Sequence, residues 1–273
     1  MHRVASAFVL LALPAFVSAA PFSNSLTGFA GKTSQDESPS QPSFATTNGF
    51  DFGFLWTGGK QGAWEQVNFS TSGATFGSNQ GGDRGRNYLR TTESDYNQTS
   101  FDAYVTYINS TTGRAFMGVG GGDRGWDSYW GLPDGLTGGN DTAFVEILNG
   151  SFATNYKKGT DDHVSNASSA TPTLSGNPTR IKMHFDTVAG TVQFAIDNNY
   201  NGSTFNPTTT LSPLSLSSAG LLGSSSLGRV FIGGDANATL KDFAVVVPEP
   251  ASLGLVMVSA LGVAGLRRRH RVA

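Results

Sequence analysis

Apolar and polar residues alternate along much of the middle of this chain, and the alternation predicts β-strands. Ile181, Met183 and Phe185 are each separated by one polar residue, and the alternation resumes over residues 191–197 after a turn at 187–190. Successive side chains of a strand point to opposite faces of its sheet. The pattern therefore predicts an antiparallel hairpin with one buried face and one face in water.

Similar alternation predicts strands over residues 101–108, 114–119, 143–148, 229–232 and 240–247. Turn-forming Gly, Ser, Thr and Asn are abundant, and no window of twelve residues has a helical apolar stripe. About ten to twelve such strands in one domain favour a two-sheet antiparallel sandwich over a small barrel. We therefore expect one all-β domain over residues 44–247, which is long enough to bury a single core.

The first residues of the chain have the organisation of a secretory signal peptide. His2 and Arg3 provide a basic start, residues 5–17 are mostly apolar, and Ala19 follows at a position that signal peptidase reads. We expect the Sec machinery to export the chain and cleavage to follow Ala19, so that residues 1–19 are removed. Residues 20–43 are rich in Ser, Pro, Gln and Gly, a composition that predicts a flexible lead-in.

The C-terminal residues 248–273 combine a polar break, a short apolar segment and a basic end. The motif residues are Pro248, Glu249, Pro250, Arg267, Arg268 and Arg269. Between them, the 16 residues 251–266 are uncharged and would form a helix about 24 Å long, somewhat shorter than a typical hydrocarbon core. We expect a transmembrane helix whose arginines stay cytoplasmic, which leaves the main body outside.

This tail resembles the PEP-CTERM sorting signal of bacterial surface proteins. The resemblance implies recognition by a membrane-embedded exosortase, transient membrane insertion, and cleavage near Pro-Glu-Pro. It also implies a final location at the outer surface or in the extracellular matrix. The proteins that carry this tail have unrelated bodies, so the resemblance does not identify the function of residues 44–247.

The charge of the body excludes some partners. Without Arg3 and the four tail arginines, 13 of the 18 basic residues remain against 20 acidic ones, a net charge near −7. An acidic surface disfavours nucleic acid as a partner. The chain has no cysteine, so disulfides and thiolate metal sites are excluded and stability must come from the core.

Residues 120–135 form the loop richest in candidate binding groups. Trp126, Tyr129 and Trp130 could stack on sugar rings, or they could turn inward and cap the end of the sandwich. Asp123, Asp127 and Asp134 are candidate Ca²⁺ ligands, although their spacing does not match an EF-hand. We expect no other cofactor.

The later strands resemble those of concanavalin A-like and laminin-G-like jelly rolls. The resemblance is carried by the hairpin at 180–197, the following Asp-Asn-Asn-Tyr-Asn-Gly, the Gly-Gly at 233–234 and the closing strand with Leu240. It implies a jelly-roll sandwich in which the hairpin faces a polymer.

Catalytic motifs are incomplete. Glycosidases of this fold carry Glu-x-Asp-x-x-Glu on one strand, but the nearest match, which starts at Glu93, has Gln98 in place of the proton donor. Glu146 and Asp141 remain as an unrecognised pair for a carbohydrate-active hydrolase. His184 occupies an outward strand position, where we expect a solvent-exposed side chain and no metal ligand.

Three functions therefore remain open. The first is a non-catalytic surface or matrix protein with a lectin-like sandwich that binds exopolysaccharide. The second is a carbohydrate-active hydrolase of jelly-roll fold, and the third is a purely structural envelope protein. The first predicts that sugar affinity is lost when Trp126 or Trp130 is replaced by Ala.

Overall fold

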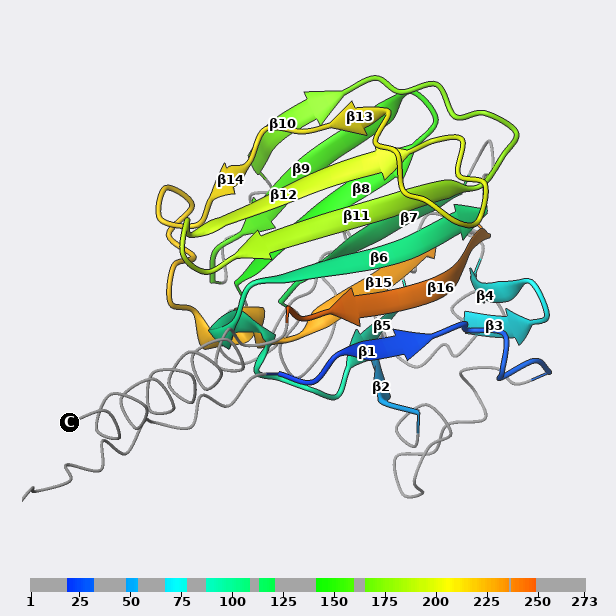
Figure 1. The fold of residues 1–273 in the computed structure, drawn as a ribbon, viewed down its shortest axis with the longest axis horizontal. Coiled ribbons are helices and arrows are strands. Elements are labelled where there is room, and N and C mark those ends of the chain that lie inside the picture. Colours follow the sequence, from blue (N-terminus) through cyan, green and yellow to red (C-terminus); the bar gives the residue numbers. More distant parts are fainter. Residues whose placement is uncertain are drawn as a thin grey trace, which may run out of the picture.

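The computed structural model describes residues 19–31, 48–53, 67–77, 87–108, 113–120, 141–159, 165–235 and 237–248. These residues form two antiparallel β-sheets packed face to face (Figure 1). Two short 3₁₀ helices, η2 (Tyr96–Gln98) and η3 (Ser225–Gly228), complete the described elements. The predicted all-β, two-sheet sandwich is confirmed.

The first sheet, called sheet A, has the strand order β13-β12-β11-β6-β16-β4-β3, with β1 also pairing with β16 and β14 with β12. Its strands are β1 (Phe22–Asn24), β3 (Val67–Ser70), β4 (Gly73–Phe76), β6 (Phe101–Ile108), β11 (Thr179–Asp186), β12 (Thr191–Asp197), β13 (Thr209–Thr210), β14 (Leu214–Ser215) and β16 (Ala238–Val246).

The second sheet, called sheet B, has the order β10-β9-β8-β7-β15-β5-β2. Its strands are β2 (Phe50–Gly53), β5 (Asn87–Thr91), β7 (Arg114–Val119), β8 (Thr142–Leu148), β9 (Ser151–Lys157), β10 (Ser165–Ala170) and β15 (Val230–Asp235). The strands that the alternation predicted are all present, and those over 101–108 and 114–119 have the expected bounds.

The main core lies between the two sheets, and strands such as β6, β7 and β11 contribute every second side chain to it. Met183 on β11 and Met117 on β7 are both fully buried there. At one end of this core the rings of Phe101 and Phe185 stack, with centroids 5.3 Å apart. Their pairing joins β6 to β11, neighbouring strands whose register also places Phe101 opposite Phe185.

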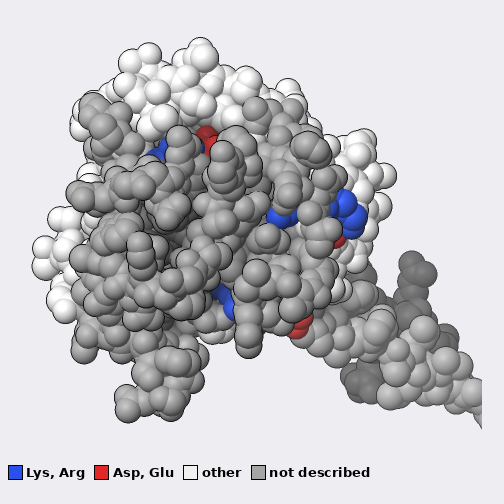
Figure 2. Space-filling model, turned by 180° about the vertical axis from the view of Figure 1, so that it is seen from behind, with Lys and Arg blue, Asp and Glu red and all other residues white. Residues whose placement is uncertain are grey.

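Sheet B is buried on its other face as well. Tyr88, Phe116, Phe144 and Phe231 form a separate cluster of buried aromatic side chains there, on the face away from sheet A. Gly118 makes room for it, since an added Cβ would lie 2.5 Å from the Cβ of Phe144. Figure 2 shows the molecule from this side, with charged side chains of the described residues visible at a few places.

The flexible lead-in predicted for residues 20–43 is wrong for residues 22–24, which form strand β1. Phe22 lies opposite Val245 of β16, and its ring meets Phe50 edge-on with centroids 4.9 Å apart. The hydroxyl of Tyr96 also donates to the carbonyl oxygen of Ala20, at 3.0 Å. Pairing with a strand distant in sequence thus orders a segment whose own composition favours disorder.

Candidate functional site

The outer face of sheet A carries polar side chains on its two central strands, β6 and β11. The alternation that buries Ile181 and Met183 sends Arg180, Lys182 and His184 outward. The register of β6 then places Thr106, Tyr104 and Asp102 opposite these three residues, in the same order. We call this face of β6 and β11, with the side chains that contact it, the polar strip.

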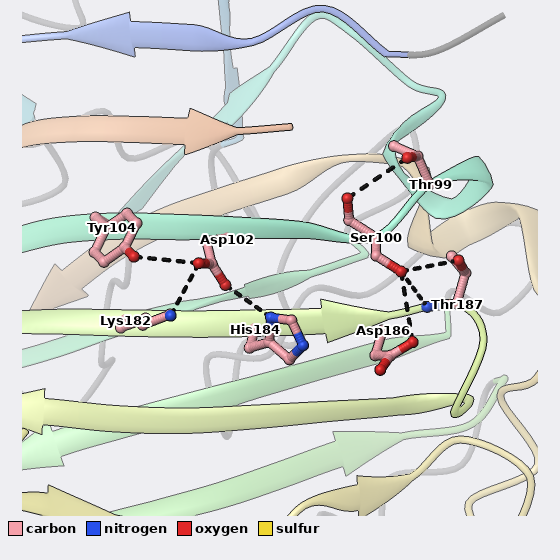
Figure 3. Close-up of polar contacts among 8 residues, drawn as sticks. All are labelled: Thr99, Ser100, Asp102, Tyr104, Lys182, His184, Asp186 and Thr187. Carbon is pink, nitrogen blue, oxygen red and sulfur yellow. Dashed lines mark hydrogen bonds and ion pairs between the residues drawn. The ribbon is translucent and has the colours of Figure 1, made fainter. Parts of the chain in front are cut away.

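Asp102 is the centre of the strip, since three side chains converge on its carboxylate (Figure 3). The Lys182 ammonium lies 2.9 Å from Oδ2, and the Tyr104 hydroxyl donates to the same oxygen at 3.2 Å. His184 places Nδ1 2.7 Å from Oδ1. The side chains of Asp102, Lys182 and His184 are 28 %, 27 % and 45 % exposed, so a ligand can reach groups that are already held in position.

Their surroundings fix the protonation of two of these groups. Burial alone would lower the pKa of Lys182, but the hydrogen bond to Asp102 and the charge of its carboxylate outweigh burial and raise that pKa. Burial raises the pKa of the Tyr104 hydroxyl, and the nearby carboxylate of Asp102 raises it further. At neutral pH the strip therefore presents an ammonium group and a neutral phenol.

Arg180 closes one end of the strip. Its Nη1 donates to Thr106 Oγ1 at 2.7 Å and to the carbonyl oxygen of Asp242 at 2.5 Å. The guanidinium lies 5.4 Å from the ring centroid of Tyr104 and 5.5 Å from that of Tyr200, both cation–π distances. Burial lowers the pKa of Arg180, which nonetheless stays charged at neutral pH because an unperturbed guanidinium titrates so high.

Besides Tyr104 on β6, the aromatic side chains at this end come from the loop that follows β12. Asp197 shapes that loop, because its carboxylate accepts the backbone N–H of Asn199 and of Asn206 at 3.1 and 3.0 Å. The loop brings Phe205 edge-on to the ring of Tyr104, with centroids 5.9 Å apart. The rings of Tyr104, Tyr200 and Phe205 are each partly exposed, so the charged strip ends in an aromatic rim.

The other end of the strip is a turn held by its own hydrogen bonds. Asp186 Oδ1 accepts the N–H groups of Val188 and Ala189, at 2.8 and 2.9 Å. The hydrogen bond from Ala189 is the main reason that the pKa of Asp186 is lowered. Ser100 joins the turn to β6, since its hydroxyl accepts the N–H of Thr187 at 3.0 Å (Figure 3).

The arrangement of the strip suits ligand binding. A glycosidase needs two carboxyl groups, one of them a proton donor. The carboxylate of Asp102 instead accepts hydrogen bonds and ion pairs from three groups. Such charge-assisted contacts suit the recognition of hydroxyl or anionic groups on a ligand.

Most residues singled out from the sequence lie outside the described part of the chain. Outside it are Trp126, Tyr129, Trp130, Asp123, Asp127, Asp134, Glu249, Pro250, Arg267, Arg268 and Arg269. Pro248 is described and is exposed two residues after β16. Within the described ranges, no group of three or more acidic or histidine side chains could hold a metal ion, and no helix has the length and apolarity to cross a membrane.

The structure does not bring Glu146 and Asp141 together as a catalytic pair. Glu146 lies on the face of β8 away from the core, beside Arg114, with 3.7 Å between Nη1 and Oε1. Asp141 precedes β8, where its carboxylate accepts Lys158 Nζ at 2.7 Å and the N–H of Gly159 at 2.9 Å. Five residues of extended chain separate the two groups by about 17 Å, and an odd spacing directs them to opposite faces.

Two further sequence interpretations are resolved. The segment that starts at Glu93 is a turn and not a strand, since Glu93 Oε1 accepts the N–H of Ser94 at 3.0 Å and Gln98 ends η2. His184 does face outward as predicted, but it is only partly exposed and is bonded to Asp102. The outward positions of both residues could have suggested this contact, but the pairing of β6 with β11 was needed to establish it.

No family model matches this chain, and no curated protein matches it in sequence. Similar solved structures include the exoplasmic/lumenal domain of VIP36 with Ca²⁺ and Man2 bound, at 8 % identity and a TM-score of 0.49, covering 77 % of this chain and 86 % of that one. A galectin-like protein of unknown function from Bacillus subtilis has 17 % identity and a TM-score of 0.44, covering 82 % and 94 %. The potassium-bound carbohydrate recognition domain of Emp46p has 10 % identity and a TM-score of 0.45, covering 82 % and 95 %. At these scores, none of them supports an argument about a site or a ligand.

Proposed function

We propose that this protein is an exported cell-envelope protein whose sandwich binds a carbohydrate without turning it over. The observation that carries the proposal is the polar strip, in which Asp102, Lys182, His184 and Tyr104 are held together on an open sheet face. The ligand class is an exopolysaccharide of the envelope, and exosortase and the Sec machinery are the processing partners.

The chemistry of the strip supports a sugar ligand. Sugars offer hydroxyl groups to charged side chains and apolar ring faces to aromatic ones, and the strip has both within a short distance. Side chains already fixed by ion pairs lose little further freedom when a ligand binds, which lowers the entropic cost of binding. Lys182 and His184 are held in this way by Asp102.

The export and anchoring parts of the proposal are supported by the sequence. The apolar residues 5–17 before Ala19 and the Pro-Glu-Pro, apolar and arginine-rich order of residues 248–273 are the features concerned. Together they describe a chain that crosses the membrane and is then held by its C-terminus, so the sandwich meets polymers outside the cell.

The test is binding of the full chain to a panel of immobilised envelope polysaccharides, measured with and without Ca²⁺. Tyr104→Ala and Lys182→Ala are expected to reduce affinity about tenfold or more, because each removes a charge-assisted or stacking contact. Asn68→Ala is the matched control, since Asn68 is an exposed residue of the same sheet on β3 and lies outside the strip. Thermal unfolding of each variant shows whether it still folds.

Trp126→Ala and Trp130→Ala belong in the same series. Loss of binding in these two variants alone would move the site to the 120–135 loop and refute the strip as the site. Release of reducing ends from any polymer would refute the non-catalytic assignment. A folded protein that binds nothing on the panel would favour the purely structural envelope protein.

A further inference from the structure

Three exposed apolar side chains lie at the same end of the sandwich. Val188, Leu222 and Val246 are the exposed large hydrophobic residues of the described chain, at 95 %, 61 % and 51 % exposure. Val188 lies in the turn between β11 and β12. Leu222 is its neighbour, since an added Cβ on Gly190 in that turn would lie 3.4 Å from Leu222 Cδ1.

Val246 belongs to the same end because of the strand register. It pairs with Asp102 near the start of β6, while Phe185 at the end of β11 pairs with Phe101. The end of β16, the start of β6 and the β11–β12 turn therefore lie beside one another, at the left in Figure 1. We call this the β16 end of the sandwich.

The chain both enters and leaves the domain at the β16 end. Strand β1 pairs antiparallel with β16, and Phe22 is opposite Val245. Continuing that register places Ala20 near Val247, so the first and last residues of the domain lie close together. The apolar run at 251–266 starts three residues after Pro248, and three extended residues reach at most about 10 Å.

We infer that the β16 end rests on the lipid bilayer that the C-terminal segment enters, with Val188, Leu222 and Val246 as the contact residues. The inference rests on the proposed membrane anchoring of the tail. So short a connection holds the end close to the lipid at a high effective concentration, and weak apolar contacts then suffice. The sandwich is thereby oriented, with the opposite end and its aromatic rim directed away from the membrane.

The contact is apolar and not electrostatic. Asp95, next to η2, and Asp186, beside Val188, carry negative charge at this end and disfavour anionic headgroups. A bilayer of zwitterionic lipids is therefore the surface that the β16 end can contact. Its contact should therefore be insensitive to salt, unlike that of a polybasic surface.

The chain has no cysteine, so single labels can be placed without removing any native residue. The full chain is reconstituted into phosphatidylcholine vesicles with an environment-sensitive fluorophore at Val188→Cys, Leu222→Cys or Val246→Cys, and nitroxide lipids serve as quenchers. Thr204→Cys is the matched control, because Thr204 is exposed in the loop after β12 at the opposite end. Ser259→Cys, within the apolar run, reports insertion of the tail.

Quenching by headgroup nitroxides at 188, 222 and 246, none at 204, and acyl-chain quenching at 259 are expected. The pair Val188→Asp and Leu222→Asp should reduce quenching at 246, which the short connection alone keeps near the headgroups, and leave that at 259 unchanged. Quenching at 259 without quenching at 188 and 222 would overturn the bilayer contact and leave the anchoring intact. No quenching at 259 would overturn both, and self-quenching between labelled copies without nitroxide would assign this end to a second copy instead.

Discussion

Strand β1 offers a sharp test of the packing described above, through the substitution Phe22→Ala. The ring of Phe22 contacts Phe50 edge-on at 4.9 Å and Phe243 at 5.7 Å between centroids. It also covers Gly49, whose added Cβ would lie 2.6 Å from the ring. Removing the ring leaves a gap between β1, β2 and β16.

The expected loss follows from the partial burial of Phe22. Truncating a fully buried phenylalanine costs about 3–5 kcal/mol, so a ring that keeps some exposure should cost less, about 2 kcal/mol of unfolding free energy. For a domain of this size, that corresponds to a fall of roughly 4–8 °C in Tm.

The assay is denaturant unfolding followed by far-ultraviolet circular dichroism, on the chain that begins at Ala20. Ser23→Ala is the control, since Ser23 is the next residue of the same strand and is exposed. It should change stability by less than about 0.5 kcal/mol. An equally small effect of Phe22→Ala would refute the reasoning and restore a flexible lead-in over residues 20–43.

Three further predictions concern other parts of the sandwich. Burial alone would raise the pKa of Asp141, but hydrogen bonds from Lys158, Ser224 and the N–H of Gly159 outweigh burial and lower that pKa. The contribution of Asp141 to stability is therefore complete above about pH 4 and is lost as the pH falls further. Asp141→Asn should reduce this loss of stability at low pH in urea unfolding, and an unchanged pH dependence would contradict the assignment. Gly228→Ala should cost at least about 2 kcal/mol in the same assay, because the new Cβ would lie 1.8 Å from the backbone oxygen of Ser94. Wild-type stability of this variant would show that Gly228 does not approach the backbone of Ser94 so closely. Among the described residues, Thr154 and Thr179 have buried hydroxyl groups without a hydrogen-bond partner. Replacing either by Val should therefore be neutral or stabilise the domain by up to about 1 kcal/mol. A marked fall in Tm would show that the hydroxyl group has a partner.

The sequence predicts those strands well whose burial differs between their two faces. Ile181 and Met183 alternate with polar residues because one face of β11 meets the core and the other meets water. The same signal is absent from β10, because Ser165–Ala170 contains only serine, asparagine and alanine and no large apolar side chain. Strand β7 was predicted with its observed bounds although its side chains are buried on both faces, with Met117 on one side and Phe116 on the other.

The candidate site was less accessible from the sequence, because it depends on which strands are neighbours. His184 and Asp102 are 82 residues apart, and only the β6–β11 register brings them to 2.7 Å. Alternation shows that both side chains point outward, but it contains no information about register between strands from different hairpins. The aromatic rim depends in the same way on the fold of a loop that Asp197 arranges.

The position of β16 constrains when this protein can fold. It is the last strand of the described residues, lies inside sheet A between β6 and β4, and also pairs with β1, the first described strand. Pairing between the two extremes of a chain is slow, because a long loop must close before the contact forms. On the proposed export route, the sandwich cannot be completed until Val246 has crossed the membrane, so the arrival of the apolar segment at the translocation pore would nearly coincide with the closing of the domain. Until then the unfinished centre of sheet A exposes pairing edges, and a chaperone that occupies them would determine how much of the protein reaches its folded form.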